Sequence, residues 1–98
     1  MILEVAILNV RTGQEAAFEA AFRDAQSIIA AANGYISHEL KRCIEKPGQY
    51  VLLVTWETLE DHTQGFRGSP AYSEWKKRLH HFYDPFPVVE HYADVSSS

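Results

Sequence analysis

The segment Ile2–Val10 is apolar on both of its faces, and this feature most limits the folds open to the chain. As a strand it is interrupted by Glu4 on one face and ended by Asn9 on the other. Its apolar residues are Ile2, Ala6, Leu8 and Val10 on the Glu4 face, and Leu3, Val5 and Ile7 on the Asn9 face. Such a strand needs a cover on both sides. The chain has 98 residues, enough for one core, so we expect one domain over 1–95 and a flexible tail, 96–98.

A helix is predicted after this strand. Thr12 and Glu15 have the spacing of a capping box, with Thr12 as the N-cap. Asn33–Gly34 is expected to end the helix, with Gly34 in the left-handed conformation. The apolar positions between these signals recur at helical spacing: Phe18, Phe22, Ala25 and Ile29.

Two further strands and a turn follow this helix. Tyr35–Ile44 alternates and has one mostly polar face, whereas Tyr50–Trp56 is almost entirely apolar, as is typical of a central strand. Pro47 and Gly48 predict a hairpin turn between them.

Two helices and a last strand complete the chain. Thr58 and Asp61 predict the start of a short helix over 59–66, and Ser69–Pro70 predicts the start of the next one. Val88–Ala93 is the last predicted strand. The order β-α-β-β-α-α-β is the ferredoxin-like α+β arrangement, with an antiparallel sheet and helices on one face. Because the helices cover only that face, a second copy of the chain is expected to cover the other.

Charge and composition argue against several classes of partner. The chain has 13 Asp and Glu against 9 Lys and Arg, so neither nucleic acid nor an anionic membrane surface is expected to bind it. No apolar run reaches the roughly 18 residues of a membrane span, and the start lacks the basic region of a signal peptide, which favours a cytoplasmic protein. Cys43 is the single cysteine, so no intrachain disulfide can form. His80 and His81 are adjacent rather than one helical turn apart, and no metal site is predicted.

Several short motifs carry a resemblance to a known family. They are Trp56–His62, Phe66, Ser69–Tyr72, Gly34–Ile36 and Asn9. Together they resemble the antibiotic biosynthesis monooxygenase (ABM) domain family, over about Ile2–Tyr92. The resemblance implies a ferredoxin-like domain that pairs sheet to sheet as a homodimer, the dimeric α/β-barrel, with a ligand pocket between the sheet and the helices.

The resemblance also implies a chemistry. Members of this family include monooxygenases that oxidise phenols, quinols and anthrones with O2 and no flavin, haem or metal, while others degrade haem or isomerise a small phosphorylated molecule. Haem-degrading members use an Asn, a Trp and a His; Asn9 fits the first position, but Gly65 and Lys76 lie near the other two, so haem degradation is not expected. His62 matches a His that is common in the quinol-oxidising type. The function implied is a cofactor-independent monooxygenase for a small aromatic or quinol-type substrate.

Oxygenation without a cofactor needs a base, a hydrogen-bond donor and a dry apolar slot. His62 is the predicted base, because the usual pKa of histidine, about 6.5, lies near working pH. Asn9 is the second predicted catalytic residue, able to hold a substrate oxygen or a peroxide. The residues predicted to bind substrate are Trp56, Phe66, Tyr72, His38 and Arg67.

Each of these predictions has a structural alternative. His62 can pack or cap on a helix, Asn9 can end a strand, and His38 can be structural or lie at a dimer interface. Trp56 and Tyr72 can be core residues only. The stretch 80–87 is expected to form a dimer contact or the mouth of the pocket. Two other functions also stay open: an isomerase or other proton-transfer enzyme acting on a small carbonyl compound, and a non-catalytic dimer that binds a small ligand.

Overall fold

The computed structural model describes residues 1–95 of the chain, and the predicted flexible tail lies outside the described residues. The elements are β1 (Ile2–Asn9), α1 (Glu15–Ala30), β2 (Tyr35–Arg42), β3 (Gln49–Trp56), η1 (Asp61–Phe66), α2 (Pro70–Leu79), η2 (His80–Phe82) and β4 (Val88–Tyr92). η1 is a single π-helical segment and η2 a short 3-10 turn. The predicted order of strands and helices, β-α-β-β-α-α-β, is confirmed.

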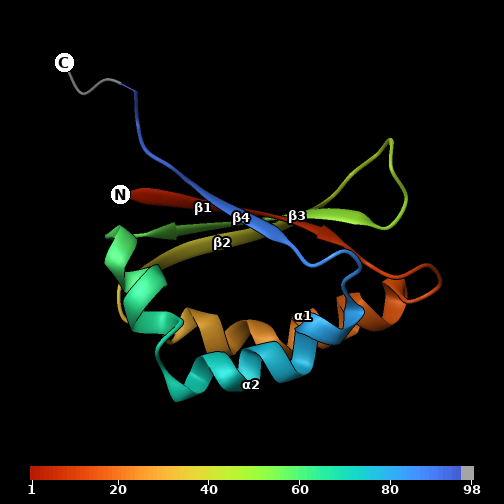
Figure 1. The fold of residues 1–98 in the computed structure, drawn as a ribbon, viewed down its shortest axis with the longest axis horizontal. Coiled ribbons are helices and arrows are strands. Elements are labelled where there is room, and N and C mark those ends of the chain that lie inside the picture. The colour runs from red at the N-terminus through yellow and green to blue at the C-terminus, as the bar shows by residue number, and fades with distance from the viewer. Residues whose placement is uncertain (96–98) are drawn as a thin grey trace.

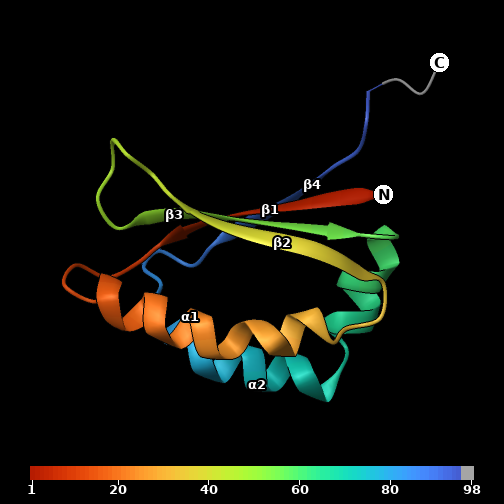
Figure 2. The same cartoon turned by 180° about the vertical axis from the view of Figure 1, so that it is seen from behind.

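The strands form one antiparallel sheet in the order β2-β3-β1-β4, which leaves β2 and β4 at its edges. Both long helices lie on the same face of this sheet (Figure 1), and Figure 2 shows the same layering from behind. The predicted ferredoxin-like α+β fold is therefore confirmed. The sheet stays open, since its two edge strands do not meet within the described residues.

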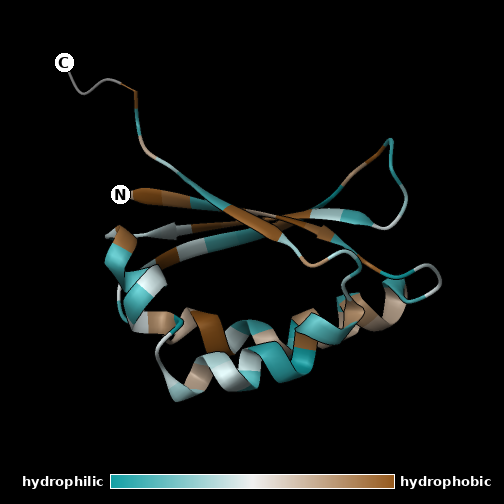
Figure 3. Cartoon of the chain, in the orientation of Figure 1, coloured by the Kyte–Doolittle hydropathy of each residue, from teal (hydrophilic) through white to brown (hydrophobic). Residues whose placement is uncertain are grey.

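The core lies between the helices and the sheet face that points at them. On that face β1 buries Ala6 and Leu8, and β3 buries every second residue from Tyr50 to Trp56. The helices contribute the residues expected from their spacing: Phe18, Phe22, Ala25 and Ile29 from α1, and Trp75 and Leu79 from α2. In Figure 3 the hydrophobic colour runs along β1, whereas most of α2 is hydrophilic.

The other face of the sheet, called the outer face below, is also apolar. Its apolar residues are Leu3, Val5, Ile7, Val51, Leu53, Val88 and Tyr92, which alternate with the inward residues of β1, β3 and β4. Charged residues border them: Glu90 of β4 lies opposite Val5, and Glu39 and Lys41 of β2 lie opposite Leu53 and Val51. No helix of the described chain lies over it (Figure 1). Ile7, Val88 and Tyr92 are 37%, 67% and 52% exposed. The predicted two-sided apolar character of the first strand is therefore present, and one side lies open in the isolated chain.

The helix starts were predicted with mixed success. Ser69 accepts a hydrogen bond from the backbone N–H of Tyr72, which confirms it as the N-cap of α2. Thr58 and Asp61 also cap as predicted: the Thr58 hydroxyl accepts from the Asp61 N–H, and the Asp61 carboxylate accepts from the Thr58 N–H. Thr12 as a cap is wrong, because Gly13 has a φ of +85° and a turn closes before the helix begins at Glu15.

The connection between α1 and β2 differs in detail from the prediction. Gly34 is left-handed as expected, with a φ of +81°, but α1 already ends at Ala30. The Asp61 carboxyl group fills the space that a Cβ at position 34 would occupy. Only glycine therefore fits there, and the residue that packs against it is the neighbour of His62. At its far end β2 stops at Arg42, two residues before the predicted boundary at Ile44.

Candidate functional site

A cavity of about 320 Å³ lies between the inner face of β1 and the helices. Ala6, Leu8 and Leu52 of the central strands form its floor. Its walls are largely aromatic, with Phe66, Tyr72, Trp75, Tyr83 and Phe86. The polar side chains that reach it are those of Glu4, His62, Arg67 and His80. A flat aromatic ligand suits such a slot, because ring edges and faces surround it.

Glu4 and His62 form a buried polar pair in the wall of this cavity. They are 5% and 3% exposed and are the only buried polar or charged residues in the part of the chain that the structure describes. His62 Nε2 lies 3.4 Å from Glu4 Oε1. The Trp56 indole N–H donates to the same oxygen at 2.9 Å. Buried polar groups are costly unless they are bonded, so this pairing keeps both groups satisfied.

His62 is held on two further sides. Its Nδ1 lies 2.8 Å from Nε2 of His91 on β4, so one ring donates a hydrogen bond to the other. The Trp56 indole stacks on the His62 imidazole, with centroids 5.2 Å apart and an angle of 21° between the planes. The imidazole therefore has both nitrogens and one ring face engaged. β1 and β4 bring His91 to this position, because Glu4 and His91 face each other in their antiparallel pairing.

The environment of this pair disfavours charge. Burial, together with the Arg67 guanidinium and His91, lowers the pKa of His62 from its usual 6.5 to about 3. Burial raises the pKa of Glu4, although the Trp56 hydrogen bond and Arg67 act in the opposite direction. Burial and Arg67 also lower the pKa of His91. Both side chains therefore favour their neutral forms, and titratable groups with shifted pKa values in a cavity are candidates for acid–base chemistry.

Two further polar side chains in the cavity wall lack protein partners. Arg67 is exposed, and among residues 1–95 no carboxylate lies within ion-pairing distance of it. His80 Nδ1 is buried without a hydrogen-bond partner in the described chain. Burial and Lys76 lower the pKa of His80. The exposed Arg67 guanidinium is therefore available to an oxygen atom of a ligand.

The structure brings four of the predicted site residues together. His62, Phe66, Arg67 and Tyr72 all line the cavity. Trp56 lies directly behind it, fully buried, and contacts His62 and Glu4 rather than the cavity. Its position therefore supports the polar pair.

Asn9 is not brought to this site. It alternates with the buried Leu8 at the end of β1, which places it on the outer face with Ile7. Its backbone carbonyl accepts a hydrogen bond from the Asp84 N–H at 2.8 Å, as expected for a residue that ends a strand. The cavity floor belongs to the other face, and Asn9 does not line it.

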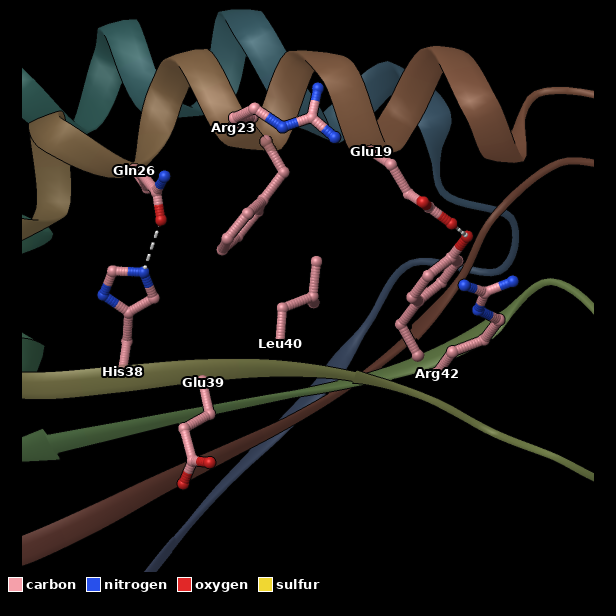
Figure 4. Close-up of a pocket in the computed structure, with 9 residues that line it drawn as sticks. Glu19, Arg23, Gln26, His38, Glu39, Leu40 and Arg42 are labelled. Atoms are coloured by element: carbon pink, nitrogen blue, oxygen red, sulfur yellow. Dashed lines mark hydrogen bonds between the residues drawn. The ribbon is translucent and has the colours of Figure 1, made fainter.

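His38 also lies away from the cavity. It faces a separate hollow of about 390 Å³ between α1 and β2 (Figure 4). There its Nε2 donates to Gln26 at 3.0 Å, and its Nδ1 accepts from the Tyr35 hydroxyl. Figure 4 shows Arg23 projecting from α1 and Arg42 from β2 at the same hollow. With both ring nitrogens bonded within the protein, His38 has the geometry of a structural histidine.

Several residues of the cavity were not predicted as site residues. Glu4 could have been found, because it is the lone charge on an otherwise apolar strand face. His91 carried a weaker signal, its alternation with Val89 on the last strand. His80, Tyr83 and Phe86 come from the stretch that was expected to form a dimer contact or the mouth of the pocket, and the structure places them in the cavity wall.

Residues 1–95 hold no group of three or more His, Cys, Asp or Glu side chains arranged to bind a metal ion. Within the same range, no helix has both the length and the apolar character needed to cross a membrane.

Comparison with known proteins places this chain in a family. Residues 1–78 match the family described as antibiotic biosynthesis monooxygenase. The uncharacterized protein YczJ of Bacillus subtilis (strain 168) is 57% identical over 95 residues, which cover 97% of this chain and 100% of that protein.

Solved structures agree with this match. A putative antibiotic biosynthesis monooxygenase from Bordetella bronchiseptica superposes with a TM-score of 0.92 at 37% identity, over 97% of each chain. SnoaB, a cofactor-independent oxygenase from Streptomyces nogalater, shares the fold with a TM-score of 0.74 at 21% identity, over 99% of this chain and 93% of that one. The family match spans most of the residues that build the sheet and the cavity, so this chain belongs to the antibiotic biosynthesis monooxygenase family.

Proposed function

We propose that the chain is a cofactor-independent monooxygenase that oxidises a small aromatic or quinol-type substrate with O2. The observation that carries this proposal is the aromatic-walled cavity of about 320 Å³ with the buried Glu4–His62 pair in its wall. The volume is near the lower end of the range for small-molecule sites, roughly 300–1,000 Å³. The activity printed for SnoaB, a relative in fold, agrees with the same chemistry.

The reaction begins with loss of a proton from the substrate. The oxidation of an anthrone illustrates the overall stoichiometry. The ring methylene loses both hydrogens, one oxygen atom of O2 becomes the oxygen of the new carbonyl group, and the other oxygen leaves as water with those two hydrogens. Removing the first proton gives an electron-rich anion that can pass an electron to O2. The protein therefore needs to accept a proton and to hold the ring in a dry slot. The Glu4–His62 pair supplies the first function and the aromatic walls the second.

The His62→Ala variant tests this proposal. General acid–base groups contribute about 100-fold or more, so O2 uptake with an anthrone should fall at least 100-fold. An oxygen electrode measures this rate directly. The exposed His81→Ala is the matched control and should keep the wild-type rate. Equal rates for His62→Ala and wild type would contradict the proposal.

One observation favours a second function, an isomerase or other proton-transfer enzyme acting on a small carbonyl compound. Asn9, the residue predicted to hold a peroxide, lies on the outer face and not in the cavity. Proton transfer by the same polar pair would then proceed without O2. Substrate turnover under nitrogen separates the two functions. A chain that binds the ligand but shows neither O2 uptake nor proton transfer would be the small-ligand-binding dimer.

We also propose that the outer face pairs with the outer face of a second copy. The support is its group of apolar side chains on β1 and β3, flanked on β4 by Val88 and Tyr92 on either side of Glu90, with Ile7, Val88 and Tyr92 exposed in the isolated chain. Burying such a surface stabilises by about 25 cal/mol per Å².

The Leu53→Lys variant tests this pairing, because it puts a charge at the centre of the outer face. The wild type should elute and scatter light at twice the 11.2 kDa of the chain, and Leu53→Lys should be monomeric. Ala20→Lys adds the same charge at an exposed position on α1 and should leave the mass unchanged. A monomeric wild type would refute the pairing.

A further inference from the structure

A continuous set of polar side chains runs from the cavity to the edge of the sheet. Glu4 and His62 both lie in the cavity wall, and His91, which contacts His62, lies on β4, the edge strand. We propose that Glu4 is the catalytic residue that takes the proton from the substrate, and that His62 and His91 carry that proton to the edge of the sheet. This inference rests on the proposed function and assigns separate roles within its proton-accepting pair.

Glu4 is better placed than His62 to touch a substrate. Both nitrogens of His62 face protein groups, Glu4 Oε1 at 3.4 Å and His91 Nε2 at 2.8 Å. A substrate would have to displace one of them to reach the imidazole. In Glu4 both close contacts fall on Oε1, so Oε2 is the oxygen left to a ligand in the cavity.

Trp56 fixes the direction of transfer. Its indole N–H can only donate, so Oε1 of Glu4 serves as an acceptor toward it and the carboxyl group cannot turn freely. Stacking of the same indole on His62 keeps the imidazole plane aimed at Glu4 and His91. The side chains are thus held in line before any ligand arrives.

The proton balance of the step is complete without an oxidant or a cofactor. The O–H or C–H bond of the substrate breaks, and its proton goes to Glu4 Oε2. The carboxyl group releases the proton carried on Oε1 to His62 Nε2, and His62 passes its Nδ1 proton to His91 Nε2. His91 then gives a proton to water at the sheet edge. Glu4 and His62 end neutral, with their protons on Oε2 and Nε2, and rotation of the carboxyl group and of the imidazole restores the starting proton positions before the next turnover.

The surrounding charges are consistent with transfer through neutral groups. The groups that face Glu4 are His62 from η1, His91 from β4, the Trp56 N–H from β3 and the Arg67 guanidinium. Burial raises the pKa of Glu4 and lowers that of His62, so a lasting charge on either is unfavourable. The guanidinium of Arg67, which has no carboxylate partner among residues 1–95, can balance the negative charge that develops on the substrate.

Exchange of the anthrone methylene with D2O, followed by NMR under nitrogen, tests proton removal apart from oxidation. Wild type should catalyse this exchange. Glu4→Gln keeps an acceptor for the Trp56 N–H but cannot take a proton, and its exchange rate should fall at least about 100-fold with anthrone affinity unchanged. The exposed Glu60→Gln is the matched control and should exchange at the wild-type rate. Thermal unfolding of each variant verifies that it folds.

A variant of His91 tests the route from Glu4 through His62 to the sheet edge, because His91 does not line the cavity. His91→Gln can still bond to His62 but cannot carry a proton onward. Exchange should slow roughly 10-fold and recover with added imidazole, which would not rescue a purely structural loss. The exposed His81→Gln should behave as wild type with and without imidazole.

The outcomes separate this inference from the proposed function. If wild type exchanges protons but takes up no O2, and exchange falls in Glu4→Gln and in His91→Gln as expected, the monooxygenase proposal fails and the proton path stands. If wild type takes up O2 and Glu4→Gln exchanges at the wild-type rate, the proton path fails and the monooxygenase proposal stands. If His91→Gln slows exchange without rescue by imidazole, Glu4 remains the acceptor and the route through His91 is overturned.

Discussion

The Trp56→Ala variant should lose about 3–5 kcal/mol of unfolding free energy, the usual range for removing a buried large aromatic ring. Trp56 is fully buried. Its ring packs against Tyr35, His62 and Phe66 at centroid distances of 6.3, 5.2 and 5.9 Å. Its N–H satisfies Glu4. Small domains are stable by only about 5–15 kcal/mol, so a large share of the total would be lost. Urea denaturation followed by far-UV circular dichroism measures the change.

Trp56→Phe separates packing from hydrogen bonding. It keeps an aromatic ring in the core but leaves Oε1 of Glu4 without its donor, which should cost about 1–3 kcal/mol. Trp56→Ala should therefore be clearly the less stable of the two. A loss of under about 1 kcal/mol for Trp56→Ala would contradict the central role of this residue.

The unfolding free energy of the wild type should also fall as the pH drops from about 6.5 toward 3. The pKa of His62 is about 3 in the folded chain against its usual 6.5. Between these values the unfolded chain binds a proton that folded His62 does not, so stability falls with pH by up to about 1.4 kcal/mol per unit. The lowered pKa of His91 acts in the same direction. Glu4 acts oppositely, because its raised pKa means that the folded chain takes up a proton first, which offsets part of the loss.

Urea denaturation from about pH 7 down to about pH 4 measures this dependence in wild type and His62→Leu. His62→Leu should show a flatter dependence, since it removes the residue with the largest downward shift of pKa described above. The exposed His81→Leu should keep the wild-type slope. Parallel curves for wild type and His62→Leu would show that His62 does not control acid stability.

The fold could be predicted from local patterns because its elements follow them closely. Nearly continuous apolar segments identified the central strands β1 and β3, alternation identified the edge strand β2, and Ser69–Pro70 marked the start of α2 as the structure has it. The exception at Thr12 arose where two local signals compete: a capping box requires helical geometry through Gly13, but that glycine takes a positive φ in the turn. Glycine tolerates that conformation, so the turn prevails and the helix starts later.

The candidate site could be predicted only in part. His62, Phe66, Arg67 and Tyr72 lie close together in sequence and on neighbouring turns, so local spacing brought them together. Glu4 and His91 lie at opposite ends of the chain and meet only through the pairing of β1 with β4. The pairing of β1 with β4 depends on the order of the strands in the sheet. The position of Asn9 relative to the cavity depends on it as well. Residue spacing alone does not specify strand order.

The contact between Gly34 and Asp61 connects the length of the α1–β2 connection to the position of the His62 imidazole. Asp61 fills the space beside the bare Cα of Gly34, and the next residue is His62. Thr58 holds the Asp61 carboxylate in place from the other side. An insertion in the α1–β2 connection would therefore displace the imidazole as well as the strand. This surface turn has less freedom to vary in length than its distance from the cavity along the sequence would suggest.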